Sequence, residues 1–214
     1  MVQGSRLLHI AKMTGAAGME NHLLLLLPGL RERGLDVRLV VLTEPDKPMT
    51  AYLAEMNRRG VPAESMTVAR SFDPALIRKL AGKLRSDGIT AVHTHLIHAD
   101  LHGWLAATLA GVKRIYSTAH NDDGFRKLLP VRLFQAFFWR QMTAGVAISE
   151  AVRQFLIHTE FAPASKIQTI HYGFDPTEIA RDCWYSRKNS APNWGFPPMR
   201  WYLAQYADWS SRRG

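Results

Sequence analysis

The stretch that decides the fold is R-L-L-H-I-A-K-M-T-G-A-A-G-M-E-N-H-L-L-L-L-L, residues 6–27 of a 214-residue chain. Its first part, Arg6–Met13, has the apolar run of a buried strand, and leucine-rich helical sequence begins near Met19. A turn of small residues that contains Gly15 and Gly18 joins the two parts. A strand that leads directly into a helix is typical of a parallel sheet with helices on both faces.

The same alternation of strand-length and helix-length segments continues along the chain. The further strands that we expect are Val37–Leu42, Ser65–Val68, Ala91–Thr94, Arg114–Thr118, Gly145–Ile148 and Ile167–Ile170. Together with the first unit, they predict an α/β fold with a doubly wound, mostly parallel Rossmann-like sheet.

Local signals mark several helix ends. Asp73 before a proline and Ser149 before a glutamate are expected N-caps, and Gly60 and Gly88 stand where helices should end. Pro28 lies inside the first helix and is expected to kink or end it.

Composition narrows the class of protein. The chain has 27 basic and 18 acidic residues, for a net charge of +9, and its single cysteine, Cys183, excludes an internal disulfide and a cysteine-rich zinc site. The longest aliphatic run, Leu23–Leu27, is far shorter than the ~20 residues that span a bilayer, so we expect a cytoplasmic protein. The positive charge favours phosphates or anionic lipids as partners. No nucleic-acid-binding module is recognisable, so no nucleic acid is expected as a partner.

The C-terminal part of the chain differs from the rest. Residues 182–214 hold four of the six tryptophans and show neither helical nor strand periodicity. We therefore expect one Rossmann-like domain over residues 1–176 and a short irregular tail over residues 177–214.

The turn after the first strand, M-T-G-A-A-G-M-E, offers a phosphate site at Gly15, Ala17 and Gly18. Free backbone N–H groups and the helix dipole favour an anion at the start of a helix. The glycine spacing does not match the dinucleotide fingerprint G-x-G-x-x-G. A tight turn without a ligand is the alternative.

The fourth expected strand ends in V-H-T-H-L-I-H-A-D-L-H, which places four histidines within ten residues: His93, His95, His98 and His102. Strand alternation aims His93 and His95 the same way, as in metal-dependent hydrolases with an H-x-H pair. Such hydrolases usually carry the pair on their first strand, and the remaining acidic candidates are only Asp100, Asp122 and Asp123. We therefore expect pocket histidines at the carboxyl edge of the sheet and no bound metal, with the metal hydrolase as an alternative.

The fifth expected strand leads into S-T-A-H-N-D-D, residues 117–123. His120 could donate a hydrogen bond to a sugar hydroxyl or a phosphate there, with Asn121 and Asp122 beside it. A capped loop without a ligand is the alternative.

The segment F-R-K-L-L-P-V-R-L-F-Q-A-F-F-W-R, residues 125–140, interleaves Arg126, Lys127, Arg132 and Arg140 with large apolar side chains. This composition suits contact with an anionic membrane surface. A buried helix that covers the sheet explains the aromatic residues equally well.

Five segments together resemble a known family. They are A-G-M-E (17–20), A-V-H-T-H (91–95), S-T-A-H-N (117–121), A-I-S-E-A-V-R (147–153) and K-I-Q-T-I-H-Y-G-F-D (166–175). Their order is similar to that of glycosyltransferase family 4, whose last segment reads K-I-x-V-I-x-N-G-V-D. Tyr172 stands where the family usually has Asn, and Ala17 stands where it has the first Gly of G-G-x-E.

The resemblance implies a GT-B fold, in which two Rossmann domains face each other across a cleft. The first binds the acceptor, a glycan or a lipid-linked acceptor of the cell envelope, and the second binds most of the nucleotide sugar. Transfer retains the anomeric configuration without a metal or a cofactor. The Gly18 loop would approach the donor diphosphate, and His120 would lie at the transferred sugar as the catalytic residue. The implied cleft residues are Glu20, His95, His98, Asn121, Asp122, Ser149 and Glu150.

The donor-binding domain of such an enzyme carries two glutamates eight positions apart, and no pair of glutamates in this chain has that separation. We therefore expect a chain that is cut short and inactive alone. Reading residues 191–214 two bases out of frame can give a string that resembles the opening of the missing domain, so a frameshift near residues 182–188 is our hypothesis for the tail. The alternative is a noncatalytic binding module whose exposed cleft face pairs with a separate donor domain.

Overall fold

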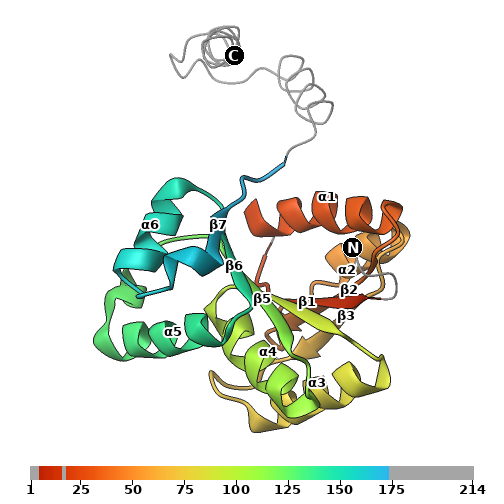
Figure 1. Ribbon diagram of the computed structural model, residues 1–214. Helices are drawn as coiled ribbons and strands as arrows, with labels where there is room; N and C mark the ends of the chain where they lie inside the picture. Colours follow the sequence, from red (N-terminus) through yellow and green to blue (C-terminus); the bar gives the residue numbers. More distant parts are fainter. Residues whose placement is uncertain (1–4, 16–17, 174–214) are drawn as a thin grey trace, which may run out of the picture. The chain divides into compact units, whose positions relative to one another are not determined.

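Seven parallel strands form one sheet in the computed structural model, which describes residues 5–15 and 18–173 (Figure 1). The strands are β1 (Arg6–Lys12), β2 (Asp36–Thr43), β3 (Ala63–Thr67), β4 (Ala91–His95), β5 (Arg114–Ala119), β6 (Ala144–Ala147) and β7 (Ile167–Thr169). Their order is β3-β2-β1-β4-β5-β6-β7, and every neighbouring pair is parallel. The predicted doubly wound α/β fold is confirmed, and the strand order reverses between β1 and β4, where such sheets bind ligands.

The helices alternate with the strands. They are α1 (Gly18–Glu32), α2 (Thr50–Arg58), α3 (Pro74–Ser86), α4 (Ile97–Ala110), α5 (Leu129–Gln141) and α6 (Glu150–His158), with short 3₁₀ helices at η1 (Gly124–Lys127) and η2 (Ala164–Lys166). Asp73 caps α3 and Ser149 caps α6, since each side chain accepts a hydrogen bond from a backbone N–H of the first turn. Gly60 and Gly88 follow α2 and α3 with φ of 79° and 61°. These four predictions are confirmed.

Pro28 does not end α1, because the helix continues to Glu32, and the expected kink stays a prediction. A proline removes the N–H that would bond to the carbonyl four residues earlier. That carbonyl, Leu24 O, instead accepts a hydrogen bond from Arg59 Nη1 at 3.1 Å. The guanidinium of a distant residue thus satisfies the group that the proline leaves free.

Alternate residues of the strands enter two hydrophobic cores, one on each face of the sheet. Leu8, Ile10 and Val92 pack with α3 to α6, whereas Ala11 and Leu39 pack with α1 and α2. The core on the α1 side comprises residues of β1 and β2 but none of β4 to β7. Among the described residues, the α1 side of β4 to β6 carries the half-buried His93, Tyr116 and Val146 beside the buried His95 and Thr118.

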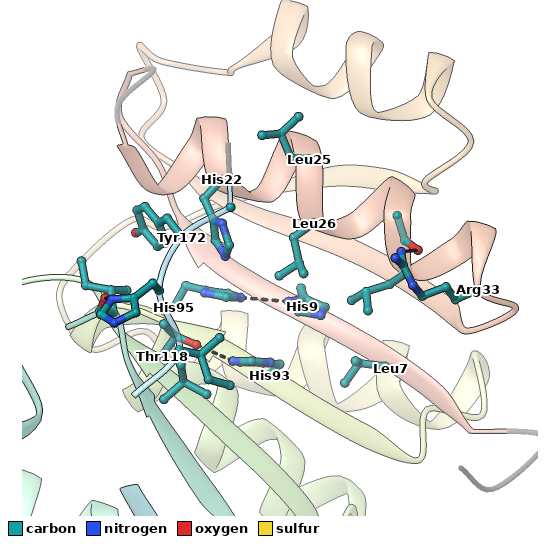
Figure 2. Close-up of a pocket in the computed structure, with 17 residues that line it drawn as sticks. Leu7, His9, His22, Leu25, Leu26, Arg33, His93, His95, Thr118 and Tyr172 are labelled. Carbon is teal, nitrogen blue, oxygen red and sulfur yellow. Dashed lines mark hydrogen bonds between the residues drawn. The ribbon is translucent and has the colours of Figure 1, made fainter. Parts of the chain in front are cut away.

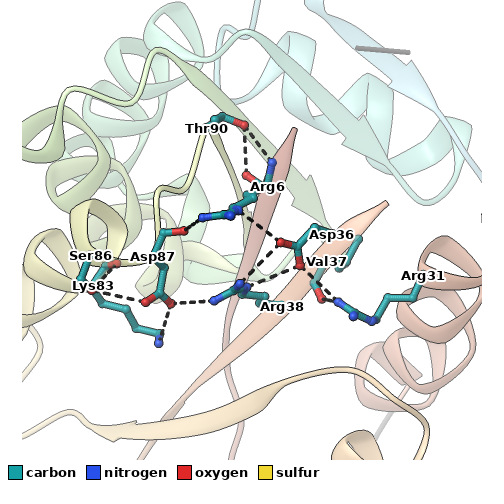
Figure 3. Close-up of polar contacts among 9 residues, drawn as sticks. All are labelled: Arg6, Arg31, Asp36, Val37, Arg38, Lys83, Ser86, Asp87 and Thr90. Atoms are coloured by element: carbon teal, nitrogen blue, oxygen red, sulfur yellow. Dashed lines mark hydrogen bonds and ion pairs between the residues drawn. The ribbon is translucent and has the colours of Figure 1, made fainter. Parts of the chain in front are cut away.

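The amino edge of the sheet is tied together by ion pairs (Figure 3). Asp36, at the start of β2, lies 3.3–3.5 Å from the guanidinium nitrogens of Arg6, Arg31 and Arg38. Arg38 also reaches Asp87 at 3.2 Å. These partly exposed charges compensate one another and leave the opposite, carboxyl edge as the place for ligand chemistry.

None of the described helices has the length and apolarity that are needed to cross a membrane. The tail that we predicted over residues 177–214 lies outside the described residues.

Candidate functional site

A cavity of about 550 Å³ lies between α1 and the α1-facing side of β1, β4, β5 and β6 (Figure 2). His9, His93 and His95 lie side by side below α1, and His22 and Leu26 of α1 point toward them. The rest of the lining is largely apolar and extends to Arg33 at the far end of α1. We call this space the α1 cavity.

The strand register explains why the histidines meet. His9 of β1 is the direct parallel partner of His93 of β4, so both side chains project from the same face of the sheet. His95 follows two residues later on that face, and its ring lies 4.6 Å from the ring of His93. The prediction that His93 and His95 point the same way is confirmed.

Sequence reasoning missed His9 and His22. His9 is a lone polar residue inside the apolar run of the first strand, and that break in the pattern was the available signal. His22 lies one helical turn after Gly18, and its ring stacks on Tyr172 with a centroid distance of 4.2 Å. Neither residue lies in a motif that we had singled out as a site.

Hydrogen bonds link three imidazoles and a phenol in a row, which we call the histidine chain. His9 Nδ1 lies 2.9 Å from His95 Nε2, and His95 Nδ1 lies 3.0 Å from His120 Nε2. His120 Nδ1 is hydrogen-bonded to the hydroxyl of Tyr172. The ends of β4 and β5 thus bring His95 and His120 together with a residue that follows β7, as convergence at the carboxyl edge predicted.

Burial keeps these imidazoles uncharged. Desolvation lowers the pKa of His93 to about 4 and the pKa of His120 to about 3, with smaller contributions from neighbouring histidines. Desolvation also holds the pKa values of His9 and His95 well below their ordinary range. The site therefore offers neutral hydrogen-bonding groups at neutral pH, and burial raises the pKa of Tyr172 to about 12, which keeps its hydroxyl protonated.

Two buried imidazole nitrogens in the α1 cavity have no hydrogen-bond partner among the described residues: His9 Nε2 and His22 Nδ1. Buried polar atoms are nearly always paired, because an unpaired one costs about 1–3 kcal/mol. The floor of the α1 cavity is therefore polar, and these two nitrogens remain without a hydrogen bond to a described residue.

His9, His93 and His95 also present nitrogens within 4.8 Å of one another, which is a separation that a metal site could use. The planes of the three rings, however, are inclined to each other by only 11–27°. Imidazole lone pairs lie in the ring plane, so the nearly parallel ring of His93 does not direct its lone pair at the space between His9 and His95. The bond between His9 and His95 engages one nitrogen of each of these two rings, so this arrangement does not favour the metal hydrolase.

The expected phosphate loop is described only in part. Gly15 and Gly18 are exposed, and the ring of Tyr172 lies 3.8 Å from the position that a Cβ atom on Gly18 would take. Ala17 lies outside the described residues. The start of α1 and the outer end of the histidine chain are therefore neighbours.

Other predicted cleft residues lie apart from the α1 cavity. His98 lines a different, apolar cavity of about 340 Å³ with Phe125 and Phe134 and does not line the α1 cavity, and its contact with a ligand stays a prediction. Its place in the first turn of α4, rather than on β4, separates it from His95. Glu20 is buried in the first turn of α1 and does not line the α1 cavity.

The predicted cleft residues after β5 and β6 are held by local contacts. Asn121 Oδ1 accepts a hydrogen bond from Arg126, whereas Asp122 is exposed. The Ser149 hydroxyl accepts the Val152 N–H as a helix cap, and exposed Glu150 accepts the Thr169 hydroxyl at 2.9 Å. Whether these side chains contact a ligand stays a prediction.

Arg126 does not belong to a membrane-facing surface, contrary to the sequence-based expectation. Its side chain is buried and forms a two-bond ion pair with Glu160, at 2.6 and 3.0 Å. Trp139 and Gln135 also donate to the Glu160 carboxylate. We call these four residues the Glu160 network. Of the other cations predicted at this surface, Lys127 and Arg140 are exposed and Arg132 is half-buried.

The sequence profile of Glycosyltransferase Family 4 matches residues 16–178. This match spans more than half of the chain, and the chain therefore belongs to glycosyltransferase family 4. The predicted family is confirmed. No curated protein sequence matches the chain.

Solved structures share the fold at low sequence identity. A glycosyltransferase from Rickettsia africae has a TM-score of 0.64 and 15% identity, over 90% of this chain and 51% of that one. Anabaena HepE, in complex with UDP and glucose, has a TM-score of 0.62 and 16% identity, over 85% and 50%. The lipopolysaccharide outer core galactosyltransferase WaaB, in its apo form, has a TM-score of 0.61 and 12% identity, over 79% and 46%. The chain thus spans about half the length of these GT-B proteins.

Proposed function

We propose that this chain is the acceptor-side half of a retaining glycosyltransferase that moves a hexose-type sugar from a nucleotide sugar to a glycan or lipid-linked acceptor of the cell envelope. His120 contacts the transferred sugar in this proposal, and the Gly18 turn approaches the donor diphosphate. The chain acts in the cytoplasm, at the inner face of the membrane.

One observation carries the proposal: the histidine chain ends at the carboxyl edge of the sheet, beside the start of α1. Neutral imidazole and phenol groups there suit the hydroxyl and ether oxygens of a sugar, while the exposed Gly15 and Gly18 suit a phosphate. Membership of the family and the Anabaena complex with UDP and glucose support a nucleotide sugar as the donor.

The chain alone should turn over no sugar nucleotide, because the principal cations that stabilise the leaving diphosphate would come from a donor-binding domain. The assay measures release of nucleotide from UDP-hexoses by the purified chain, with and without the separately produced donor-binding half of a family member. We expect turnover only in the mixture. Turnover by the chain alone would contradict the proposal that a donor-binding domain supplies the principal cations.

A noncatalytic binding module is the second candidate, and the α1 side of β4 to β6 favours it. Among the described residues, that side does not enter the core with α1 and α2, which leaves room for a partner to pack. In that case the mixture would form a complex on a sizing column and would release no nucleotide with any hexose donor. The two candidates thus differ in turnover and agree in complex formation.

We further propose that α5 contacts an anionic membrane. Leu129, Leu133 and Phe137 are each more than half exposed, and Lys127 and Arg140 are exposed beside them. Apolar side chains flanked by cations are what an interfacial helix needs. Although Arg126 is buried, this face therefore presents both apolar and cationic side chains.

Vesicle co-sedimentation tests the membrane contact. Leu133→Glu should weaken binding to vesicles that contain phosphatidylglycerol, whereas Leu109→Glu on α4 changes a similarly exposed leucine and should have no effect. Equal binding by the wild type and Leu133→Glu would contradict the proposed surface.

A further inference from the structure

Both ring nitrogens of His120 are engaged by protein groups, Nε2 by His95 and Nδ1 by Tyr172. The row continues inward, because the other nitrogen of His95 pairs with His9. A neutral imidazole has one donor nitrogen and one acceptor nitrogen, so all three rings must donate in the same direction along the row. Only two arrangements satisfy every hydrogen bond, one that donates outward to Tyr172 and one that donates inward to His9.

The inner end of the row distinguishes the two arrangements. His9 is only 1% exposed, and its Nε2 has no partner among the described residues. If the row donates outward, this nitrogen is an unfilled acceptor; if it donates inward, it is a buried N–H without an acceptor. Buried N–H groups without a partner are rarer in proteins than unfilled acceptors. The outward arrangement is therefore favoured.

We propose that His9, His95 and Tyr172 are positioning residues that hold His120 as its Nδ1–H tautomer, so that His120 donates a hydrogen bond toward the carboxyl edge of the sheet. Tyr172 accepts this bond and keeps its own hydroxyl proton for donation outward. The inference deepens the proposed function, on which it rests for the contact between His120 and a sugar. It specifies the ligand group as an oxygen that accepts a hydrogen bond from the uncharged Tyr172 hydroxyl.

The surrounding contacts hold the rings in place. Tyr172 stacks on His22 with an interplanar angle of 13°, and its ring also packs against Gly18, so α1 fixes the phenol oxygen. The His93 ring stacks on the face of the His95 ring. His93 Nε2 is hydrogen-bonded to the Thr118 hydroxyl at 2.7 Å (Figure 2). A ring held at both nitrogens and on its face keeps its tautomer when the partner atoms stay in place.

Nitrogen NMR of the imidazole rings measures the tautomer directly. The full chain, labelled with ¹⁵N-histidine, is recorded at pH 7.5, and the resonances of His120 are assigned by loss in His120→Asn. We expect the proton on Nδ1 and an unprotonated Nε2. A His120 ring with its proton on Nε2 would overturn the proposal. Because no substrate is present, this result does not depend on whether the chain takes part in sugar transfer.

Substitutions then test the role of the neighbours. Tyr172→Phe keeps the stacked ring but removes the acceptor, so the ratio of the Nδ1–H to the Nε2–H tautomer should fall by about fivefold, which corresponds to the loss of one net hydrogen bond. Tyr116→Phe is the matched control, because the Tyr116 ring lies near His93 but its hydroxyl has no hydrogen bond to a described residue.

His9→Leu removes the inner donor and should lower the same ratio. An unchanged His120 ratio in both Tyr172→Phe and His9→Leu would show that the neighbours do not set the tautomer and would contradict the proposal. If His9→Leu does not fold, Tyr172→Phe and the wild-type tautomer still decide the question.

Discussion

The Glu160 network and the histidine chain are both buried polar networks, but they differ in charge and in whether they adjoin a cavity. The Glu160 carboxylate faces the guanidinium of Arg126 and receives two further donors, from Trp139 and Gln135. The histidine chain carries no formal charge at neutral pH and leaves His9 Nε2 without a partner among the described residues. Gln135 Oε1 of the Glu160 network also has no partner among the described residues, but it does not line the α1 cavity. A network built on an ion pair is expected to hold structure together, and a neutral one with an unpaired nitrogen at a cavity is expected to receive a ligand.

The largest expected effect comes from breaking the Glu160 network. Glu160→Ala should lower the free energy of unfolding by about 3–5 kcal/mol, because it leaves the Arg126 guanidinium buried without its counter-ion. Urea denaturation measures the change. Glu55→Ala removes an exposed partner of Arg58 and Arg59 and should have a much smaller effect. Equal losses in both variants would show that the Glu160 network is not the stabilising element that we describe.

Acid should destabilise the protein through the histidine chain. The folded-state pKa values of His9, His93, His95 and His120 lie below the ordinary histidine value of 6.5, so the unfolded chain binds more protons between about pH 4 and pH 6.5. Their contribution to stability is present above pH 6.5 and is lost as the pH falls through this window. Urea midpoints at pH 8 and pH 5 test this, and His93→Phe should reduce the difference.

Asp100 should change the stability with pH in the opposite direction to the histidines. It therefore tests the predicted sign of the pH dependence. Burial raises its pKa to about 7, although the Thr94 and Ser117 hydroxyls donate to its carboxylate. Its contribution to stability is present at low pH and is lost as the pH rises through 7. Asp100→Asn should therefore make stability rise more steeply with pH, and an unchanged slope would argue against the raised pKa.

Overpacking the Glu160 network should have an intermediate effect. A Cβ atom on Gly145 would lie 2.5 Å from the Trp139 ring and 2.7 Å from Ile167, so Gly145→Ala should lower the free energy of unfolding by about 1–3 kcal/mol. Gly82 on α3 has no described atom within 4 Å of its added Cβ. Gly82→Ala should leave stability unchanged or raise it, because alanine favours a helix. A stable Gly145→Ala variant would mean that Trp139 can move without cost.

The smallest expected effect comes from His22, which lines the α1 cavity. His22→Phe keeps a ring against Tyr172 and removes the unpaired Nδ1, so the free energy of unfolding should stay within about 1 kcal/mol of the wild type or rise slightly. Thermal unfolding measures this change. A large loss of stability would show that His22 has a structural hydrogen bond after all.

The fold could be predicted from the sequence because its signals are local. Strand-length apolar runs, the Asp73 and Ser149 caps and the glycines after α2 and α3 depend on neighbouring residues alone. The continuation of α1 past Pro28 was not predictable in this way. It depends on Arg59, which lies 35 residues from the carbonyl that it satisfies.

The site could be predicted only where the ends of neighbouring strands supplied it. His95 and His120 follow adjacent strands, and the convergence of strand ends predicted their meeting. His9 joins them through the pairing of β1 with β4, and Arg126 turns inward toward Glu160, which lies 34 residues later. Strand register and a long-range ion pair determine these positions, and local sequence patterns predict neither.

The most direct test of the account is the nucleotide-release assay in the mixture of this chain with a donor-binding half, run for His120→Ala beside His158→Ala. His158 is an exposed histidine in the last turn of α6 and does not line the α1 cavity. His120→Ala removes the ring that orients the Tyr172 hydroxyl. Loss of one preorganised hydrogen-bond donor at a transition state typically costs about 10²–10³ in rate, so His120→Ala should lose about 100-fold or more while His158→Ala keeps wild-type turnover. Equal turnover by the two variants, with both folded, would contradict the assignment of the histidine chain to the transferred sugar.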